Sequence, residues 1–481
     1  MFVLRALLAP VRWTIKTVGL LLARGGWIDL RRAVRTSDLA WPRIVTGVAR
    51  MSRTAVDVAM VGAAVGAPAI AGVGFATPYW ALAFVLGGGI AGGTISLVSQ
   101  RFSASDQQKG DAGVSTAVAV SAAFAVAATL PLTLLFWVAP EPLIRLIGSG
   151  GEAVGYGARY LRLVSLSMPF AALNLVASRT LVGAGDAWAP MVVRAGGAAA
   201  NVALNAVLIF GFGWGVAGAA LGTVVTTASV TGVFAVGLTA GRLPLVGALP
   251  VRIRWAASGG RRRRTARDLF AIAAPLALTS FVQMGAQFPL LAIVSLFGPQ
   301  VVAAFVIALR VRDLLNTPGW GFGLASSSLV GQALGRGRED EATAYGRDVL
   351  RFALAVYAGA AAVVFVLAAP VAQLFTSNAA VAPAAAALIR ATCVSVVFWG
   401  LMNGALGPLR AGGDTRWPFY GQALGLFAFA LPAAYLGATT ALGMAGLYAA
   451  LVLETVVPAA VTYARYRSGR WRVMSRAYRP A

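Results

Sequence analysis

The sequence predicts an all-α polytopic membrane protein with twelve transmembrane helices, arranged as two six-helix bundles. Composition, the spacing of apolar runs and an internal repeat support this prediction. Of the 481 residues, 59% are hydrophobic and 12% are charged, whereas soluble domains carry about 25% charged residues. Twelve spans of ~20 residues use roughly 240 positions and leave room for connectors. The chain has too little polar surface to cover soluble domains, so we expect lipid to cover it.

Twelve apolar runs follow one another along the chain, six on each side of a basic linker. The runs lie at about 41–65, 74–98, 113–138, 156–182, 187–210, 216–240, 269–297, 301–334, 347–372, 384–410, 416–437 and 443–465. Ahead of them, residues 1–40 are expected to form an amphipathic surface helix and a basic connector. We therefore divide the chain into 1–40, a first bundle at 41–240, a linker at 241–267, a second bundle at 268–465 and a basic tail at 466–481.

The basic residues follow the pattern expected when both termini are cytoplasmic. Connectors after the even-numbered spans carry Arg or Lys, most densely in the linker run Arg261–Arg264, except the connector after the fourth span, which carries Asp186. Connectors on the other side carry none except Arg145. Since cytoplasmic loops are enriched in Lys and Arg, we predict a multi-pass protein of the cell (inner) membrane. The net charge of +24 is then explained by topology, and no nucleic-acid partner is expected.

The two halves share short motifs in the same order. Leu181–Pro190 reads LVGAGDAWAP and Leu409–Pro418 reads LRAGGDTRWP, with Leu, Gly, Asp and Pro at the same spacing. Further matches join SLVSQ at Ser96 with SLVGQ at Ser328, and GVAG at Gly215 with GMAG at Gly443. Three ordered matches indicate an internal repeat. Because each repeat holds an even number of spans, the halves keep one orientation, with a pseudo-two-fold axis along the membrane normal.

Composition also excludes several kinds of chemistry. The chain has no histidine and one cysteine, Cys393, so imidazole catalysis, an internal disulfide and thiolate metal clusters are ruled out. The Gly-rich stretches lack the lysine and the strand–loop–helix context of a phosphate loop. We therefore expect no enzyme activity, no metal and no organic cofactor.

Three acidic residues remain well inside the apolar runs: Asp57, Asp313 and Glu454. An ionisable group in the bilayer costs several kcal/mol, so each is a functional candidate. Asp57 is either a structural ion pair with Arg53 at i−4, with Arg50 on the same face, or a carboxylate that exchanges a proton or Na⁺. Asp313 follows two arginines and is expected to form a local ion pair. Glu454 must be protonated, paired across helices or exposed to water.

Polar side chains in the fifth and sixth spans could complete a site around Asp57. Asn201 and Asn205 lie four apart on one helical face, and the sixth span adds Thr223, Thr226 and Thr227. Such groups bond one helix to another. Their oxygens, together with a carboxylate, would also suit a hard monovalent cation. Both interpretations stay open.

With these motifs, the chain resembles the multidrug and toxic-compound extrusion (MATE) transporters over residues 40–465, in the prokaryotic branch with the cation site in the N-terminal half. The resemblance places Asp57, Asn201 and Thr223 at coupling positions and Pro42 at the bend of the first span. Asn205 stands where that branch has an acid. The missing acid and the nearby Arg50 and Arg53 argue against Na⁺ and leave proton exchange at Asp57. Glu454 occupies the position in the second repeat that Thr226 has in the first, and it could supply a second protonatable group.

The expected function is secondary active efflux of amphipathic or cationic organic compounds in exchange for H⁺, or less favourably Na⁺, by alternating access. A monomer in the lipid bilayer is expected. The alternative is a flippase for a lipid-linked precursor, which would use arginines at positions such as Arg194 and Arg310. Substrate identity is not encoded in a recognisable motif.

Overall fold

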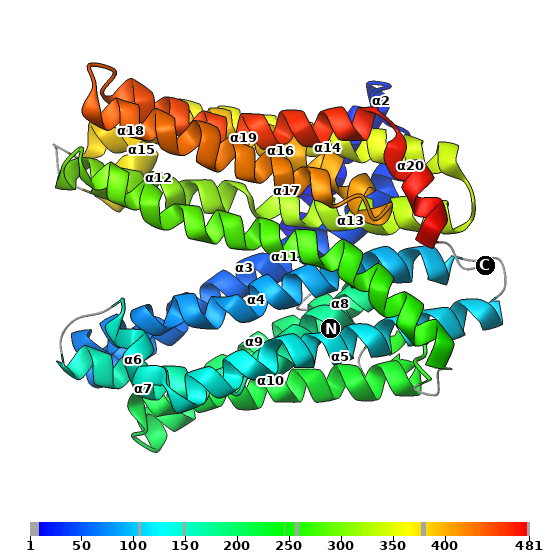
Figure 1. The fold of residues 1–481 in the computed structure, drawn as a ribbon, viewed down its shortest axis with the longest axis horizontal. Coiled ribbons are helices and arrows are strands. Elements are labelled where there is room, and N and C mark those ends of the chain that lie inside the picture. Colours follow the sequence, from blue (N-terminus) through cyan, green and yellow to red (C-terminus); the bar gives the residue numbers. More distant parts are fainter. Residues whose placement is uncertain are drawn as a thin grey trace. The chain divides into compact units, whose positions relative to one another are not determined.

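The computed structural model describes residues 9–103, 107–147, 151–244, 246–254, 259–376 and 381–478. Nearly all of them are helical (Figure 1), which confirms the all-α prediction. Contacts divide the chain into two compact units: Val45–Ala277, and a second unit that combines the segment up to Ile44 with Leu278–Arg479. The two boundaries therefore fall inside helices rather than in connectors: one in α3 (Leu30–Val65) and one in α11 (Gly259–Ser295).

The first unit contains the second half of α3 and most of the helices that follow it. These are α4 (Ala67–Phe102), α5 (Gln107–Val138), α6 (Pro140–Arg145), α7 (Gly151–Ser165), α8 (Met168–Gly183), α9 (Trp188–Ala206), the π-helix η1 (Val207–Gly211) and α10 (Gly215–Ala240). A short antiparallel hairpin, β1 (Arg242–Leu243) with β2 (Gly247–Ala248), follows α10 in the predicted linker. The first part of α11 (Gly259–Ser295) completes the unit.

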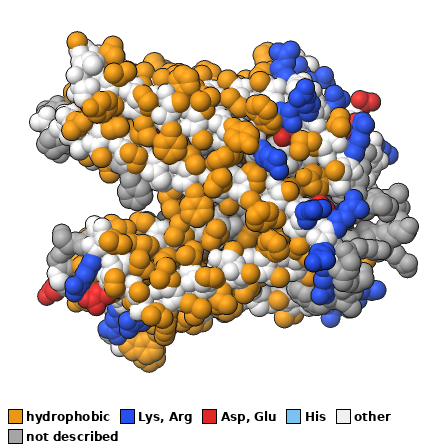
Figure 2. All heavy atoms as spheres, in the orientation of Figure 1, with side chains coloured by type: hydrophobic (Ala, Val, Ile, Leu, Met, Phe, Trp, Pro, Cys, Tyr) orange, Lys and Arg blue, Asp and Glu red, His pale blue; other side chains and the backbone are white. Residues whose placement is uncertain are grey.

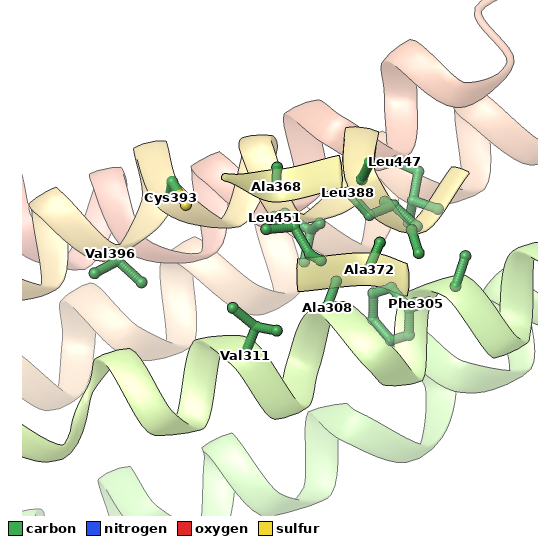
Figure 3. Packing of buried hydrophobic residues seen from close by; sticks show 14 of the residues in the cluster. Phe305, Ala308, Val311, Ala368, Ala372, Leu388, Cys393, Val396, Leu447 and Leu451 are labelled. Atoms are coloured by element: carbon green, nitrogen blue, oxygen red, sulfur yellow. The ribbon is translucent and has the colours of Figure 1, made fainter. Parts of the chain in front are cut away.

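The second unit contains α2 (Ala9–Arg24), the start of α3, the rest of α11 from Leu278 and the remaining helices. These are α12 (Pro299–Leu315), α13 (Thr317–Gly335), α14 (Glu339–Val366), α15 (Ala368–Phe375), α16 (Ala382–Ala411), α17 (Arg416–Ala423), the π-helix η2 (Leu424–Ala430), α18 (Leu431–Thr439), α19 (Met444–Arg467), α20 (Arg470–Ser475) and the 3₁₀ turn η3 (Arg476–Tyr478). Their buried side chains form one large apolar cluster. Figure 3 shows Phe305 and Ala308 of α12 packed near Ala372 of α15 and Leu451 of α19.

Nine helices in the described part of the chain are long and apolar enough to cross a membrane. The pair α7 and α8, bent by 48°, gives a tenth. The two other predicted runs fall on α3, which carries several charged residues, and on α12 with α13, which are separate helices meeting at Asn316. Each of the twelve runs thus corresponds to a helix or a helix pair. In each unit the face seen in Figure 2 is largely hydrophobic along the helices, with Lys and Arg gathered toward the helix ends.

The internal repeat is visible in the backbone. Gly185 and Gly413, at equivalent positions of the repeated motif, have φ of 92° and 79°, and Gly215 and Gly443 have φ of 51° and 50°. Residues with a Cβ rarely adopt such angles. The same turns therefore occur in both halves, with glycine at the equivalent position of each. Two more pairs of glycines with positive φ occupy equivalent positions in the two halves: Gly241 with Gly469, and Gly66 with Gly298.

In the N-terminal segment, residues 9–24 form helix α2, and the connector that follows is shorter than expected. In α2, Trp13 is 70% exposed, and Lys16 forms an ion pair of 2.8 Å with Asp38 of α3. From Leu30 the chain is already α3. Nε of Arg32 lies 2.6 Å from Oδ2 of Asp348 in α14, a carboxylate whose side chain is 4% exposed. Polar residues of this first part of α3 are therefore packed against the protein and not held in a loop.

Candidate functional site

Asp57 lies in the second half of α3 and receives a hydrogen bond from α9. Nδ2 of Asn205 donates to Oδ1 of Asp57 over 2.8 Å. The side chain of Asp57 is 16% exposed, and Asn205 is fully buried. Hydrogen bonds to an ionised acceptor are shorter and stronger than neutral ones. The contact joins the predicted carboxylate to the residue that stands in place of the second acid.

The hydrogen-bonded chain continues from Asn205 through Asn201 into α10. Nδ2 of Asn205 lies 3.4 Å from Oδ1 of Asn201, a weak contact. Nδ2 of Asn201 donates to Oγ1 of Thr226 over 3.0 Å. Because Asn201 and Asn205 are one helical turn apart, both amides reach the same side of α9. Three helices are thus connected through polar groups at Asp57.

Thr223 is buried beside this chain but takes no part in it among the described contacts. Its hydroxyl donates to the carbonyl of Ala219 in the preceding turn of α10, at 3.0 Å. Thr226, in the next turn of the helix, is the α10 residue that reaches Asn201. Thr226 belongs to the group of threonines that the sequence places on this helix, whereas the resemblance points to Thr223.

Arg53 provides positive charge next to Asp57 without a close hydrogen bond. Its Nε lies 3.9 Å from Oδ2 of Asp57, and each side chain is 16% exposed. The i,i+4 pairing expected from the sequence is therefore present, although the shorter contact of Asp57 is with Asn205. Arg50 lies in the same helix, but its side chain is outside the described part of the structure. Tyr160 of α7 is also within electrostatic reach of Asp57 and Arg53.

Pro42, the predicted hinge, lies inside α3 and does not interrupt it. A proline in a helix interior removes one backbone hydrogen bond and favours a kink. It lies just before the point where α3 passes from one unit to the other, between Ile44 and Val45. The role of Pro42 as a hinge stays a prediction, and its position close to this boundary suits that role.

Glu454 is paired across helices, one of the three states that the sequence allowed. Nη1 of Arg312 in α12 lies 3.1 Å from both Oε1 and Oε2 of Glu454 in α19. The Arg312 and Glu454 side chains are 7% and 13% exposed, and the guanidinium lies 5.1 Å from the ring centre of Trp399. Both residues line a cavity of about 210 Å³ with Asp313. Among the described residues Asp313 forms no salt bridge, because Arg312 pairs with Glu454, although Arg312 and Arg310 both lie within electrostatic reach of Asp313.

Gly222 makes the position of Asn205 possible. A Cβ at Gly222 would collide with Oδ1 of Asn205. Gly222→Ala should therefore displace the amide that holds Asp57 and lower the free energy of unfolding by about 1–3 kcal/mol, as overpacking does. Thermal unfolding of the purified protein measures the change. Gly232→Ala is the matched control, because Gly232 lies in the same helix and a Cβ there meets nothing within 4 Å. Equal midpoints for the two variants would contradict this account.

Comparison with known proteins identifies the family. The MatE family model matches residues 42–207 and 275–436. The chain is 26% identical over 446 residues to "Probable multidrug resistance protein NorM" of Bradyrhizobium diazoefficiens, covering 90% of this chain and 93% of that protein. It is 27% identical to "Multidrug resistance protein PmpM" of Pseudomonas aeruginosa, over 83% of each chain.

Solved structures agree on the fold. A structure described as "Crystal structure of MATE in the straight conformation" superposes with a TM-score of 0.81 at 21% identity, over 92% of this chain and 97% of that one. This likeness extends over both halves, so the twelve-span prediction is confirmed together with the all-α class. The sequence matches, the fold and the apolar helices lead to the same conclusion: the chain belongs to the MatE family and is a multi-pass membrane transporter.

Proposed function

We propose that this transporter exports small amphipathic organic compounds, cationic ones included, in exchange for H⁺ by alternating access. Membership of the MatE family and the similarity to two proteins named as multidrug resistance proteins support multidrug efflux. These relatives offer no support for a lipid-linked precursor flippase. The observation that carries the proton assignment is the hydrogen bond from Asn205 to Asp57, a carboxylate largely withdrawn from solvent.

Protonation of Asp57 changes both of its contacts. A neutral carboxyl accepts the Asn205 hydrogen bond more weakly than a carboxylate does, and it no longer offsets the charge of Arg53. The second half of α3 thereby loses its polar tie to α9, and a bend at Pro42 becomes easier. We propose that this change drives the step that releases substrate outside, and that deprotonation toward the cytoplasm resets the cycle.

The arrangement around Asp57 favours H⁺ over Na⁺ as the coupling ion. A hard cation requires several oxygen ligands, but Asn205 presents its NH₂ group to Asp57. The Oδ1 atom of Asn205 is directed toward Gly222. The guanidinium of Arg53, with Nε 3.9 Å from Asp57, adds a positive charge that would repel a metal ion. A proton needs only the carboxylate itself.

Glu454 is a weaker candidate for the coupling group. Both of its oxygens lie 3.1 Å from Arg312, so protonation would leave a buried guanidinium without its counter-charge. We therefore assign coupling to Asp57 and a structural role to Glu454. No organic cofactor or metal enters the proposed cycle.

Reconstitution into liposomes under separate ion gradients tests the proposal. Under an imposed pH gradient, the wild-type protein should transport a fluorescent lipophilic monocation in exchange for H⁺, and a protonophore should stop this transport. A Na⁺ gradient of equal size at uniform pH should give only the rate of protein-free liposomes. Transport that follows the Na⁺ gradient and survives the protonophore would reverse the ion assignment, while transport under neither gradient would reject export itself.

A further inference from the structure

The first unit contains a cavity whose charge is opposite to that expected for a site binding cations. The cavity measures about 80 Å³ and lies between the second half of α3 and helices α4, α8, α9 and α10. Its walls include Arg53 of α3, Arg194 of α9 and the aromatic rings of Trp80 and Phe84 in α4. None of the described residues that line it is acidic. The wall therefore carries two positive charges and no negative one.

Asp57 is the carboxylate that lies beside Arg53, and it stands outside the lining of this cavity. Its Oδ2 is 3.9 Å from Nε of Arg53, and its closer contact is with Asn205. Positive charges in a weakly solvated space attract an anion strongly, because the local dielectric is low. An organic cation would instead be repelled by the guanidinium groups of the wall.

The rest of the cavity suits a small polar head joined to an apolar body. Thr46, Thr226 and Thr227 also line it. The Thr227 hydroxyl can supplement the guanidinium donors, whereas the Thr226 hydroxyl donates to the carbonyl of Gly222. Trp80 and Phe84 pack edge to face with centroids 4.8 Å apart, and both line the cavity. The volume of about 80 Å³ is small beside the roughly 300–1,000 Å³ of pockets for drug-sized ligands, so the cavity suits a head group rather than a whole drug-sized molecule.

We propose that this cavity binds the anionic head group of an amphipathic compound: a carboxylate, sulfonate or phosphate held by Arg53 and Arg194, with an aromatic or apolar body against Trp80 and Phe84. Guanidinium groups match such oxyanions in charge, and their parallel N–H donors can bind two oxygens of one head group. The inference goes beyond the proposed export of cations. It does not depend on proton coupling, because binding can be measured without any gradient.

Matched aromatic probes test the charge preference. The full-length protein in phosphatidylcholine nanodiscs is dialysed against naphthalene-2-sulfonate or 2-naphthyltrimethylammonium, with empty nanodiscs subtracted. The wild type should bind the sulfonate at least about tenfold more tightly than the trimethylammonium compound. Arg194→Gln should weaken binding of the sulfonate by about tenfold or more. Arg145→Gln is the control: it removes one positive charge from the same unit at a side chain that is 68% exposed and far from this wall in the sequence. Arg145→Gln should bind the sulfonate as the wild type does.

Two further arms keep the test decisive. Arg194→Lys retains the charge and should keep the preference for sulfonate, with weaker binding than the wild type because the two-pronged contact is lost. Phosphatidylglycerol added to the nanodiscs distinguishes the source of the head group. Displacement of the sulfonate from the wild type identifies a lipid as the occupant, and its persistence identifies a soluble compound. Equal binding of the two probes by the wild type, or equal sulfonate binding by Arg194→Gln and Arg145→Gln, would overturn the proposal.

Discussion

Asp57→Asn is expected to reduce proton-driven export to the rate of protein-free liposomes. Asparagine has nearly the same shape as aspartate, but it can neither take up nor release a proton between the two sides of the membrane. The substitution also removes the carboxylate that Asn205 binds at 2.8 Å and Arg53 approaches at 3.9 Å. The measurement is efflux of a lipophilic monocation under an imposed pH gradient.

Asp38→Asn is the matched control for this loss. Asp38 lies in the same helix, but its side chain is 50% exposed and pairs with Lys16, so its replacement should leave export unchanged. Substrate exchange without a gradient should persist in Asp57→Asn, which separates loss of coupling from loss of folding. Wild-type rates of proton-driven export in Asp57→Asn would show that Asp57 is only a structural partner of Arg53.

Glu454→Gln is expected to lower the free energy of unfolding by about 3–5 kcal/mol, the cost of removing one partner of a buried ion pair. Both carboxylate oxygens lie 3.1 Å from Nη1 of Arg312, and the two side chains are 7% and 13% exposed. A glutamine would leave the guanidinium without its paired counter-charge, with the ring of Trp399 at 5.1 Å and Asp313 within electrostatic reach. Thermal or denaturant unfolding in detergent measures the loss.

Removing both charges should restore what the single substitution loses. Arg312→Met with Glu454→Leu should unfold at or above the wild-type midpoint, since apolar residues of similar size often replace a buried pair without loss. The double variant should also keep proton-driven export if coupling resides at Asp57. Glu141→Gln breaks an exposed pair with Arg145 and should change the midpoint little. A stable double variant without export would move the coupling role to Glu454.

The sequence predicted helices well where they are apolar and poorly where they are polar. The sixth run was expected at 216–240 and is α10, Gly215–Ala240. The first run was expected from 41, yet α3 begins at Leu30. Its early turns are charged, and they pack through Arg32 against Asp348, a residue of α14 that is remote in the sequence. Hydropathy measures how favourably side chains transfer from water to lipid, so it does not predict such packing of polar side chains.

The candidate site shows the same limit. The contact of Arg53 with Asp57 could be predicted because both lie on one helix at i and i+4. Asn205 could be placed on a polar face of its helix. Whether Asp57 or a group on another helix accepts the hydrogen bond from its amide depends on how α3 and α9 pack. The partner of Glu454 lies far away in the sequence, on α12. No periodicity within a helix could have selected Arg312 over the neighbouring Arg310.

The π-helical segments have a consequence for how side chains are oriented. η1 follows Asn205 closely within the fifth span, and η2 lies within the eleventh. Each wide turn accommodates one extra residue, so side chains beyond it are rotated by about 100° relative to an unbroken α-helix. Moving the wide turn along the helix by one residue exchanges one backbone hydrogen bond for another. The eleventh span, which continues as α18 beyond η2, could thus rotate its end about the helix axis without tilting the helix and without leaving backbone groups unpaired in lipid.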